Sequence, residues 1–202
     1  KRYATYFVES DSATYYRIVH QLMSNKYHFE KKSVQKELLT KLKGFNLFPE
    51  LNHHEIDNLI AHGCQPIHPV TLYLLPRISK VFGQNERTLF TYLESEDPYG
   101  FKEYIKKNNG YIYADTLFLY FFSESDFENI YDEKTKSVIR TYKLIRSNLD
   151  ARKKNAYCVI RFMTLWQLTN SNRVYNLDIE LISFATGLDV NKVKEILEEL
   201  TR

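Results

Sequence analysis

Apolar residues recur at helical spacing along almost the whole chain. After Asp11 and Ser12, either of which can cap a helix, apolar residues follow at i, i+3, i+4 and i+7. A second helix of this kind is expected to begin at Ser33 and to end before Gly44. The apolar positions of these two predicted helices are Tyr15, Ile18, Val19 and Leu22, then Val34, Leu38, Leu39 and Leu42.

The next two predicted helices carry clear start signals. Asn52 is followed three residues later by Glu55, which is the spacing of a capping box, and Gly63 is expected to end this helix. Pro69 suits the first turn of the following helix. Because residues 69–81 are apolar almost all round, we expect them to form the central buried helix.

The middle of the chain predicts shorter helices and one ambiguous segment. Asp97 is expected to cap a helix with Pro98 in its first turn. In "DTLFLYFF" the β-branched and aromatic content allows a strand, whereas Asp115 favours the start of a helix. A long polar helix is predicted from Glu124 to Asn148, with acids first and bases last, as the helix dipole favours.

The C-terminal segment has the order of a helix-turn-helix. Residues 155–168 predict a buried helix, and residues 173–177 could form one short strand. Asp178 begins a further helix, and the turn at Gly187 leads into a last one. The positions of the last helix that are expected to face inward are Val193, Ile196, Leu197 and Leu200.

Together these patterns predict an all-α fold with at most a small β-ribbon. A multi-helix, lid-like bundle is expected over residues 1–150 and a winged-helix-like region over residues 151–202. The chain has 202 residues, of which 44% are apolar and 26% charged, which is ordinary for a globular protein. The first residue is Lys1 rather than Met, from which we expect a piece of a longer protein.

Composition also bears on the compartment. No stretch approaches the ~20 uninterrupted apolar residues that span a bilayer, so we expect no membrane partner. Cys64 and Cys158 lie in apolar contexts without paired spacing, which predicts reduced thiols in a cytoplasmic protein.

Short catalytic motifs are absent from the sequence. It contains no Walker A motif, no dinucleotide-binding glycine motif, no nucleophile elbow and no H-E-x-x-H. We therefore do not expect the chain to be an enzyme by itself. A group of histidines with one cysteine suggests zinc, but its spacing fits none of the usual ligand pairs, so capping and packing are favoured and no metal is expected. This group is His53, His54, His62, Cys64 and His68.

Two segments raise the possibility of DNA binding. The formal net charge is only +3, yet bases gather around a single Asp150, where they could follow phosphates or equally form a helix end and a solvated loop. These candidate nucleic-acid-binding residues are Arg140, Lys143, Arg146, Arg152, Lys153 and Lys154. In the predicted last helix, glutamates on the exposed side oppose phosphate binding, which favours a structural or protein-contacting role. The residues of that exposed side are Asn191, Lys192, Lys194, Glu195, Glu198 and Glu199.

The run "IHPVTLYLLPRISKVFGQNERTLFTYL" resembles a segment of very large bacterial P-loop ATPases of the AAA+ or STAND type, many of which are associated with phage defence or DNA restriction. Residues 1–21 resemble the stretch that follows the last core strand of these ATPases, and residues 157–200 resemble their trailing winged-helix part. The matching positions of the central run are His68, Pro69, Leu75, Pro76, Gln84, Asn85, Glu86, Arg87, Thr88, Leu89 and Phe90.

The resemblance implies a helical lid and winged-helix region that senses nucleotide state and relays it to partner domains. The ATPase core would lie upstream in the same polypeptide, and ATP with Mg²⁺ would be cofactors of that parent protein rather than of this chain. Arg87 is the first candidate for a guanidinium near the γ-phosphate, Arg77 the second and Arg2 the third. Glu86 would orient the guanidinium and Asn85 would cap the helix.

Other interpretations stay open from the sequence. Arg87 could simply pair with a carboxylate on a helix surface. As a whole, the chain could instead be a helical nucleic-acid-binding domain that contains a helix-turn-helix and contacts DNA through its basic residues. It could also be a protein-interaction scaffold without a ligand of its own.

Overall fold

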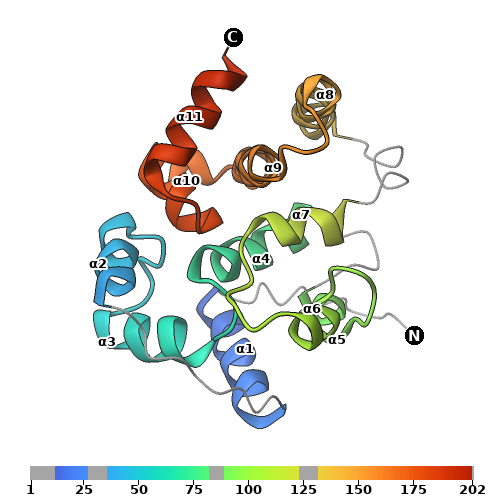
Figure 1. Ribbon diagram of the computed structural model, residues 1–202. Coiled ribbons are helices and arrows are strands. Elements are labelled where there is room, and N and C mark those ends of the chain that lie inside the picture. The colour runs from blue at the N-terminus through green and yellow to red at the C-terminus, as the bar shows by residue number, and fades with distance from the viewer. Residues whose placement is uncertain (1–11, 27–35, 82–88, 123–131, 202) are drawn as a thin grey trace, which may run out of the picture.

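A computed structural model of the chain describes residues 12–26, 36–81, 89–122 and 132–201 (Figure 1). These residues form helices joined by turns and loops, and the described ranges contain no β-strand, which confirms the predicted all-α fold. One isolated bridge pairs Ile67 with Ile112. None of the helices in these ranges combines the length and the apolar character needed to cross a bilayer.

The helices follow one another along the chain with short connections. They are α1 (Ser12–Lys26), α2 (Lys36–Phe45), α3 (His53–Glu55), the π-helix η1 (Ile56–Gly63), α4 (Pro69–Val81), α5 (Leu89–Glu94), α6 (Phe101–Lys107), α7 (Asp115–Phe121), α8 (Glu133–Asn148), α9 (Lys154–Leu168), the 3₁₀-helix η3 (Ser171–Arg173), α10 (Ile179–Thr186) and α11 (Val190–Leu200).

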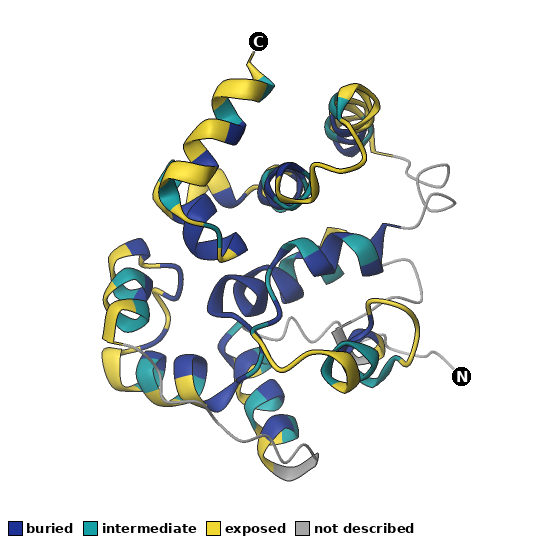
Figure 2. Ribbon diagram, viewed as in Figure 1, coloured by how far each residue is buried: buried dark blue, intermediate teal, exposed yellow. Residues whose placement is uncertain are grey.

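Helix α4 is the centre of the molecule, as its apolar sequence predicts. It contacts α1, η1, α5, α9 and α10, so neighbours cover it on several sides. Every residue from Pro69 to Pro76 is buried, and Figure 2 shows this helix as almost continuously buried. A helix that is apolar all round must be surrounded in this way, because no side of it can face water without cost.

A row of aromatic rings crosses the core and joins the N-terminal helices to the C-terminal ones. Tyr16 of α1 packs edge-on against Phe48 at a centroid distance of 5.1 Å, and Phe48 lies 6.0 Å from Tyr73 of α4. Tyr73 lies 5.6 Å from Trp166 of α9, which is 5.6 Å from Phe162. All five rings are fully buried, and one apolar cluster therefore includes residues of both predicted regions.

Polar caps define the helix ends that the sequence predicted best. Glu55 N–H donates to Asn52 Oδ1 over 3.0 Å, and Glu55 Oε2 accepts from Asn52 N–H over 3.1 Å, which confirms the capping box. Asp178 accepts from Leu181 N–H at the start of α10 over 2.7 Å. Asp189 likewise caps α11, so these starts follow from local sequence alone.

Several predicted helix boundaries were wrong, because a neighbouring residue and not the predicted one takes the conformation that begins or ends the helix. Gly44 lies inside α2, and Asn46, with a φ of 47°, is the left-handed residue that follows this helix. Helix α6 begins at Phe101 rather than near Asp97, because Tyr99 has a φ of 70° and a turn precedes the helix. Helix α8 begins at Glu133 after the extended residue Asp132, which caps it, so the predicted helix is not continuous; its expected start at Glu124 lies outside the described residues.

Two further expectations were corrected by tertiary contacts. Residues 173–177 form no strand. Arg173 is the last residue of η3, and the carbonyl of Tyr175 accepts a hydrogen bond from the indole of Trp166 over 3.2 Å. The buried face of α1 is also rotated from the predicted one: Tyr16 points inward, and its hydroxyl accepts a part-buried hydrogen bond from Arg77. The fully buried residues of α1 are Ala13, Tyr16, Val19 and Met23. The ambiguous segment at 115–121 is the helix α7.

The connection between α6 and α7 ties the start of α4 to the helix-turn-helix. Ile112 donates to Pro66 O over 2.9 Å and accepts from His68 N–H over 3.1 Å. Further along, Ala114 N–H donates to Ala185 O of α10 over 3.3 Å. This extended segment thus fills the space between α4 and α10, and its position brings Tyr113 onto the turn between α10 and α11.

We expect Gly187→Ala to destabilise the protein much more than Gly110→Ala. Gly187 has a φ of 70°, and a Cβ atom there would lie 2.6 Å from the hydroxyl oxygen of Tyr113. The left-handed conformation costs roughly 1–2 kcal/mol for a residue with a Cβ, and overpacking adds roughly 1–3 kcal/mol. Gly110 has nothing within 4 Å of its added Cβ. Urea unfolding of the two variants provides the comparison, and equal midpoints would contradict the packing described here.

Candidate functional site

A cavity of about 580 Å³ lies where α2, the segment 111–113 and the turn between α10 and α11 meet. We call it the aromatic cleft and define it by its ring residues and its charged pair. The rings belong to His68, Tyr111, Tyr113 and Phe184, and the charged pair is Glu37 with Lys41 of α2. Gly187, in the turn between α10 and α11, also lines the cavity, so the helix-turn-helix and the N-terminal helices both contribute to it.

Alternation along an extended segment explains how two tyrosines reach the cleft. In an extended chain successive side chains point to opposite sides. Ile112 is fully buried in the core, whereas its neighbours Tyr111 and Tyr113 are half-buried and line the cavity. Sequence analysis missed this pair, because a Tyr-Ile-Tyr alternation is a weak signal unless the buried side is known.

His68 is the buried polar group of the cleft. Only 2% of its surface is exposed, and its ring lies 4.6 Å from that of Phe184 and 5.1 Å from that of Tyr113, measured between centroids. Burial lowers the pKa of His68 to about 3, so the imidazole is neutral at pH 7. Its Nδ1 accepts from Val70 N–H over 3.3 Å, from which we assign the ring proton to Nε2.

The Nε2–H of His68 makes no hydrogen bond with any residue that the structure describes. The residue as a whole is buried, but among the described residues its Nε2 atom is not one of the buried side-chain atoms that lack a partner, so this donor is reached from the cavity. Since His68 lines the cavity, this donor is available to a molecule that enters the cleft.

The charges of the cleft nearly balance. Lys41 and Glu37 form an i,i+4 ion pair on α2 with a separation of 3.1 Å. The carboxylate of Asp189 also lines the cavity, and it is engaged in capping α11 through the N–H of Asn191. Among the described residues, the walls therefore carry two carboxylates and one ammonium, and these residues offer no cluster of bases for a phosphate.

Of the five nucleotide-sensing candidates, the structure describes Arg77. Its guanidinium donates to Tyr73 O over 2.7 Å and to the hydroxyl of Tyr16 over 3.1 Å, and it lies 3.6 Å from the ring centroid of Tyr73. Burial raises the pKa of Tyr16 to about 12, although the charge of Arg77 acts in the opposite direction. Arg77 thus joins α1 to α4. The other four candidates lie outside the described residues: Arg2, Asn85, Glu86 and Arg87.

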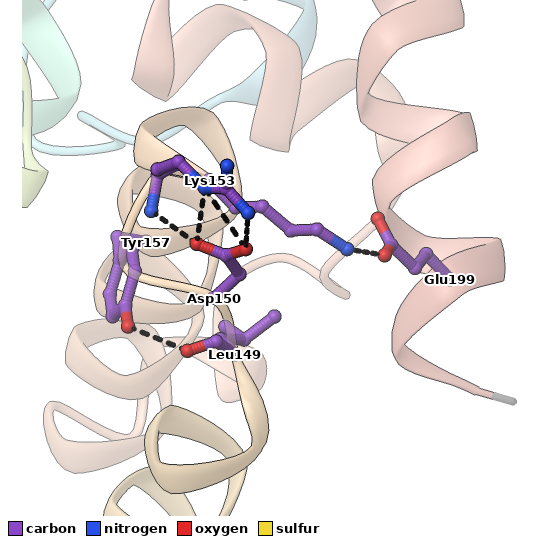
Figure 3. A network of polar contacts seen from close by, with 6 residues as sticks. Leu149, Asp150, Lys153, Tyr157 and Glu199 are labelled. Carbon is purple, nitrogen blue, oxygen red and sulfur yellow. Dashed lines mark hydrogen bonds and ion pairs between the residues drawn. The ribbon is translucent and has the colours of Figure 1, made fainter.

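Two of the six bases in the predicted nucleic-acid-binding patch form ion pairs with carboxylates. Arg152 binds Asp150 through Nε and Nη2, with a shortest distance of 2.7 Å, and Lys153 at the start of α9 pairs with Glu199 of α11 (Figure 3). These carboxylates reduce the attraction of both bases for phosphates. The remaining four bases are exposed, with Lys154 on α9 and Arg140, Lys143 and Arg146 on α8.

The outer side of α11 is exposed, as predicted, and is mixed in charge. Lys192 pairs with Glu195 over 2.9 Å, and the side as a whole carries three glutamates against two lysines. Figure 2 shows this side of the helix facing solvent. A surface of this charge is unsuited to the sequence-independent part of DNA binding.

The histidines and the cysteine that suggested zinc point to different places. His54 bonds with Asn58 over 2.9 Å, the thiol of Cys64 donates to Tyr16 O, and His68 lies in the aromatic cleft. Within the ranges that the structure describes, no three His, Cys, Asp or Glu side chains are grouped closely enough to hold a metal ion.

A buried acid and thiol between α7 and α9 were also missed by sequence analysis. Burial raises the pKa of Asp115, and the thiol of Cys158 donates a hydrogen bond to it. Burial, followed by the charge of Asp115, raises the pKa of Cys158 to about 12. This thiol is therefore protonated and a poor nucleophile, and both cysteines are free.

We expect Arg77→Ala to lower the free energy of unfolding by roughly 1–3 kcal/mol, because it removes two hydrogen bonds and a cation–π contact. Arg77→Lys should recover only part of this loss, since a compact ammonium group cannot stack on the ring of Tyr73 as a planar guanidinium does and also donate to both partners. Lys80→Ala, on the exposed side of the same helix, is the control. If chemical unfolding finds Arg77→Ala and Lys80→Ala equally stable, Arg77 does not join the two helices.

Stability should also depend on pH through His68. Its folded pKa of about 3 lies below the ordinary value of 6.5, so between these values the unfolded chain binds a proton that the folded protein does not. This contribution is complete above pH 6.5 and is lost as the pH falls towards 3, with a slope of up to about 1.4 kcal/mol per pH unit.

His68→Asn keeps an acceptor near Val70 N–H but cannot titrate. The variant should therefore show a flatter decline of unfolding free energy between about pH 6.5 and 5, a window above the range of ordinary carboxylates. Unfolding in urea at several pH values measures the slope. A slope unchanged by the substitution would mean that His68 is not held neutral by the fold.

Comparisons of this chain with protein-family models, with curated proteins and with solved structures found no match. The resemblance of residues 67–93 to P-loop ATPases therefore stays a prediction. What the chain does has to be argued from its own residues and their geometry.

Proposed function

We propose that this chain is a non-catalytic helical region of a larger P-loop ATPase, which senses nucleotide state and relays it to partner domains. The observation that carries the proposal is the position of α4. Residues 69–81, which belong to the run that resembles the ATPases, form the buried helix that contacts both α1 and the C-terminal helices α9 and α10.

Rigid packing supports a relay in this protein. The row of rings from Tyr16 through Tyr73 to Trp166 leaves little room for α1 and α9 to move independently of α4. Protein interiors are packed as densely as organic crystals, so a displacement at one end of such a helix is transmitted rather than absorbed. In this proposal the displacement begins beyond the end of α4, where Arg87 follows in sequence.

The partner of the C-terminal helices is expected to be protein rather than DNA. The exposed side of α11 carries more acids than bases, and Lys153 is occupied by Glu199. Mixed charges of this kind suit a surface that contacts another domain of the same polypeptide or another protein. The resemblance is also the basis for expecting a parent ATPase that is associated with phage defence.

We expect Arg87→Ala, in the longer protein that contains this chain, to reduce ATP hydrolysis by a hundred-fold or more, since a guanidinium at the γ-phosphate accelerates phosphoryl transfer by roughly 10³–10⁵. Hydrolysis is measured by phosphate release, and circular dichroism establishes that the variant is folded. Lys80→Ala, on the exposed side of α4, is the matched control and should leave turnover unchanged.

Three results would count against this proposal. Normal turnover in Arg87→Ala would exclude Arg87 as the sensor. A parent sequence without Walker A and B motifs would remove the ATPase itself. Tight, salt-dependent binding of DNA by the isolated chain, weakened by neutralising Arg152, Lys153 and Lys154 together, would favour a nucleic-acid-binding domain instead.

A further inference from the structure

The aromatic cleft has the features of a binding site for a small ligand. We propose that it binds an uncharged, planar heteroaromatic molecule of the nucleobase class, stacked on its tyrosine rings and accepting a hydrogen bond from His68. This inference goes beyond the proposed relay of nucleotide state and does not depend on it.

The buried donor is the first argument for a ligand. His68 is almost completely buried, its Nδ1 is occupied by Val70 N–H, and its Nε2–H has no partner among the described residues. A ligand with a ring nitrogen or carbonyl acceptor would satisfy this donor. An acceptor placed at this donor would add a hydrogen bond that a molecule without an acceptor cannot make, so the site would favour ligands with an acceptor.

The walls supply the second argument. The rings of Tyr111 and Tyr113 have centroids 6.3 Å apart and planes inclined at 60°, and that of Tyr111 stands at 90° to the ring of His68. Both rings are half-buried and line the cavity, and nucleobases of every kind can stack on aromatic rings that remain accessible. The cavity volume of about 580 Å³ lies within the range of small-molecule sites.

Charge decides between classes of ligand. The carboxylates of Glu37 and Asp189 and the aromatic rings would favour a cation, but beside His68 a cation would meet the positive end of the Nε2–H dipole. An anion would meet the carboxylates of Glu37 and Asp189, with only the paired ammonium of Lys41 to attract it. An uncharged molecule avoids both penalties, which is why we infer a neutral base rather than a phosphate or an ammonium group.

The turn of the helix-turn-helix forms one wall of the cleft. Tyr113 lies directly against Gly187, and the hydroxyl of Ser183 in α10 donates to Leu188 O over 2.7 Å. A ligand stacked on Tyr113 would therefore contact the junction of α10 and α11. Binding would stabilise this junction by mass action.

The test uses adenosine as the probe, with indole and tetramethylammonium as comparison molecules. Adenosine carries ring acceptors, indole offers only a donor, and tetramethylammonium is a cation without hydrogen-bonding groups. Two-dimensional NMR of the isotope-labelled chain reports binding, and we expect adenosine to shift the amide signals of Tyr111, Tyr113 and Gly187 with a dissociation constant in the millimolar range or below.

Matched tyrosine variants locate the site. Tyr111→Ala should weaken adenosine binding roughly ten-fold or more, whereas Tyr99→Ala, at an exposed tyrosine outside the cleft, should leave it unchanged. His68→Asn should weaken adenosine but affect indole much less, because indole cannot accept the hydrogen bond. Unfolding curves show whether each variant is folded.

The proposal is overturned if adenosine at up to about 5 mM produces no shifts, since binding that weak carries no specificity. It is also overturned if Tyr111→Ala and Tyr99→Ala have equal effects, which would locate the binding elsewhere. Stronger binding of tetramethylammonium than of adenosine would identify a cation site instead. Equal losses of adenosine and indole in His68→Asn would remove the hydrogen bond from the argument.

Discussion

The complete burial of α4 is the constraint on which the rest of the structure depends. A helix that is apolar on every side gains roughly 1.5–3 kcal/mol for each large side chain that it removes from water. It can do so only if other helices surround it, and α1, η1, α5, α9 and α10 all contact it. Segments far apart in the chain are thereby brought onto one helix, and the aromatic rings of Tyr73 and Trp166 meet at its contact with α9.

The same constraint creates the aromatic cleft. His68 immediately precedes α4, so its imidazole ring is buried together with that helix. The extended segment at 111–113 then pairs with the chain around His68 and reaches α10 through Ala114. These elements leave a cavity between them, and His68, Tyr111 and Tyr113 are among the residues that line it.

Local sequence predicted those features of the fold that depend on neighbouring residues. The capping box at Asn52 and the caps at Asp178 and Asp189 involve atoms only two or three positions apart, so their spacing is visible in the sequence. The wrong boundaries have a different origin. Tyr99 has a left-handed φ, and the indole of Trp166 donates a hydrogen bond to the carbonyl of Tyr175. Neither feature can be recognised from the neighbouring sequence.

The sequence by itself therefore determined that the chain is helical, where several helices start and which helix lies at the centre, because periodicity and capping are short-range properties. Only the tertiary structure decided what the polar side chains without a partner nearby in sequence do. Arg77 meets Tyr16 across 61 positions of sequence, and His68 meets Phe184 across the molecule. The packing of helices around α4 determines which side chains meet. This packing depends on the whole chain and cannot be inferred from a single segment.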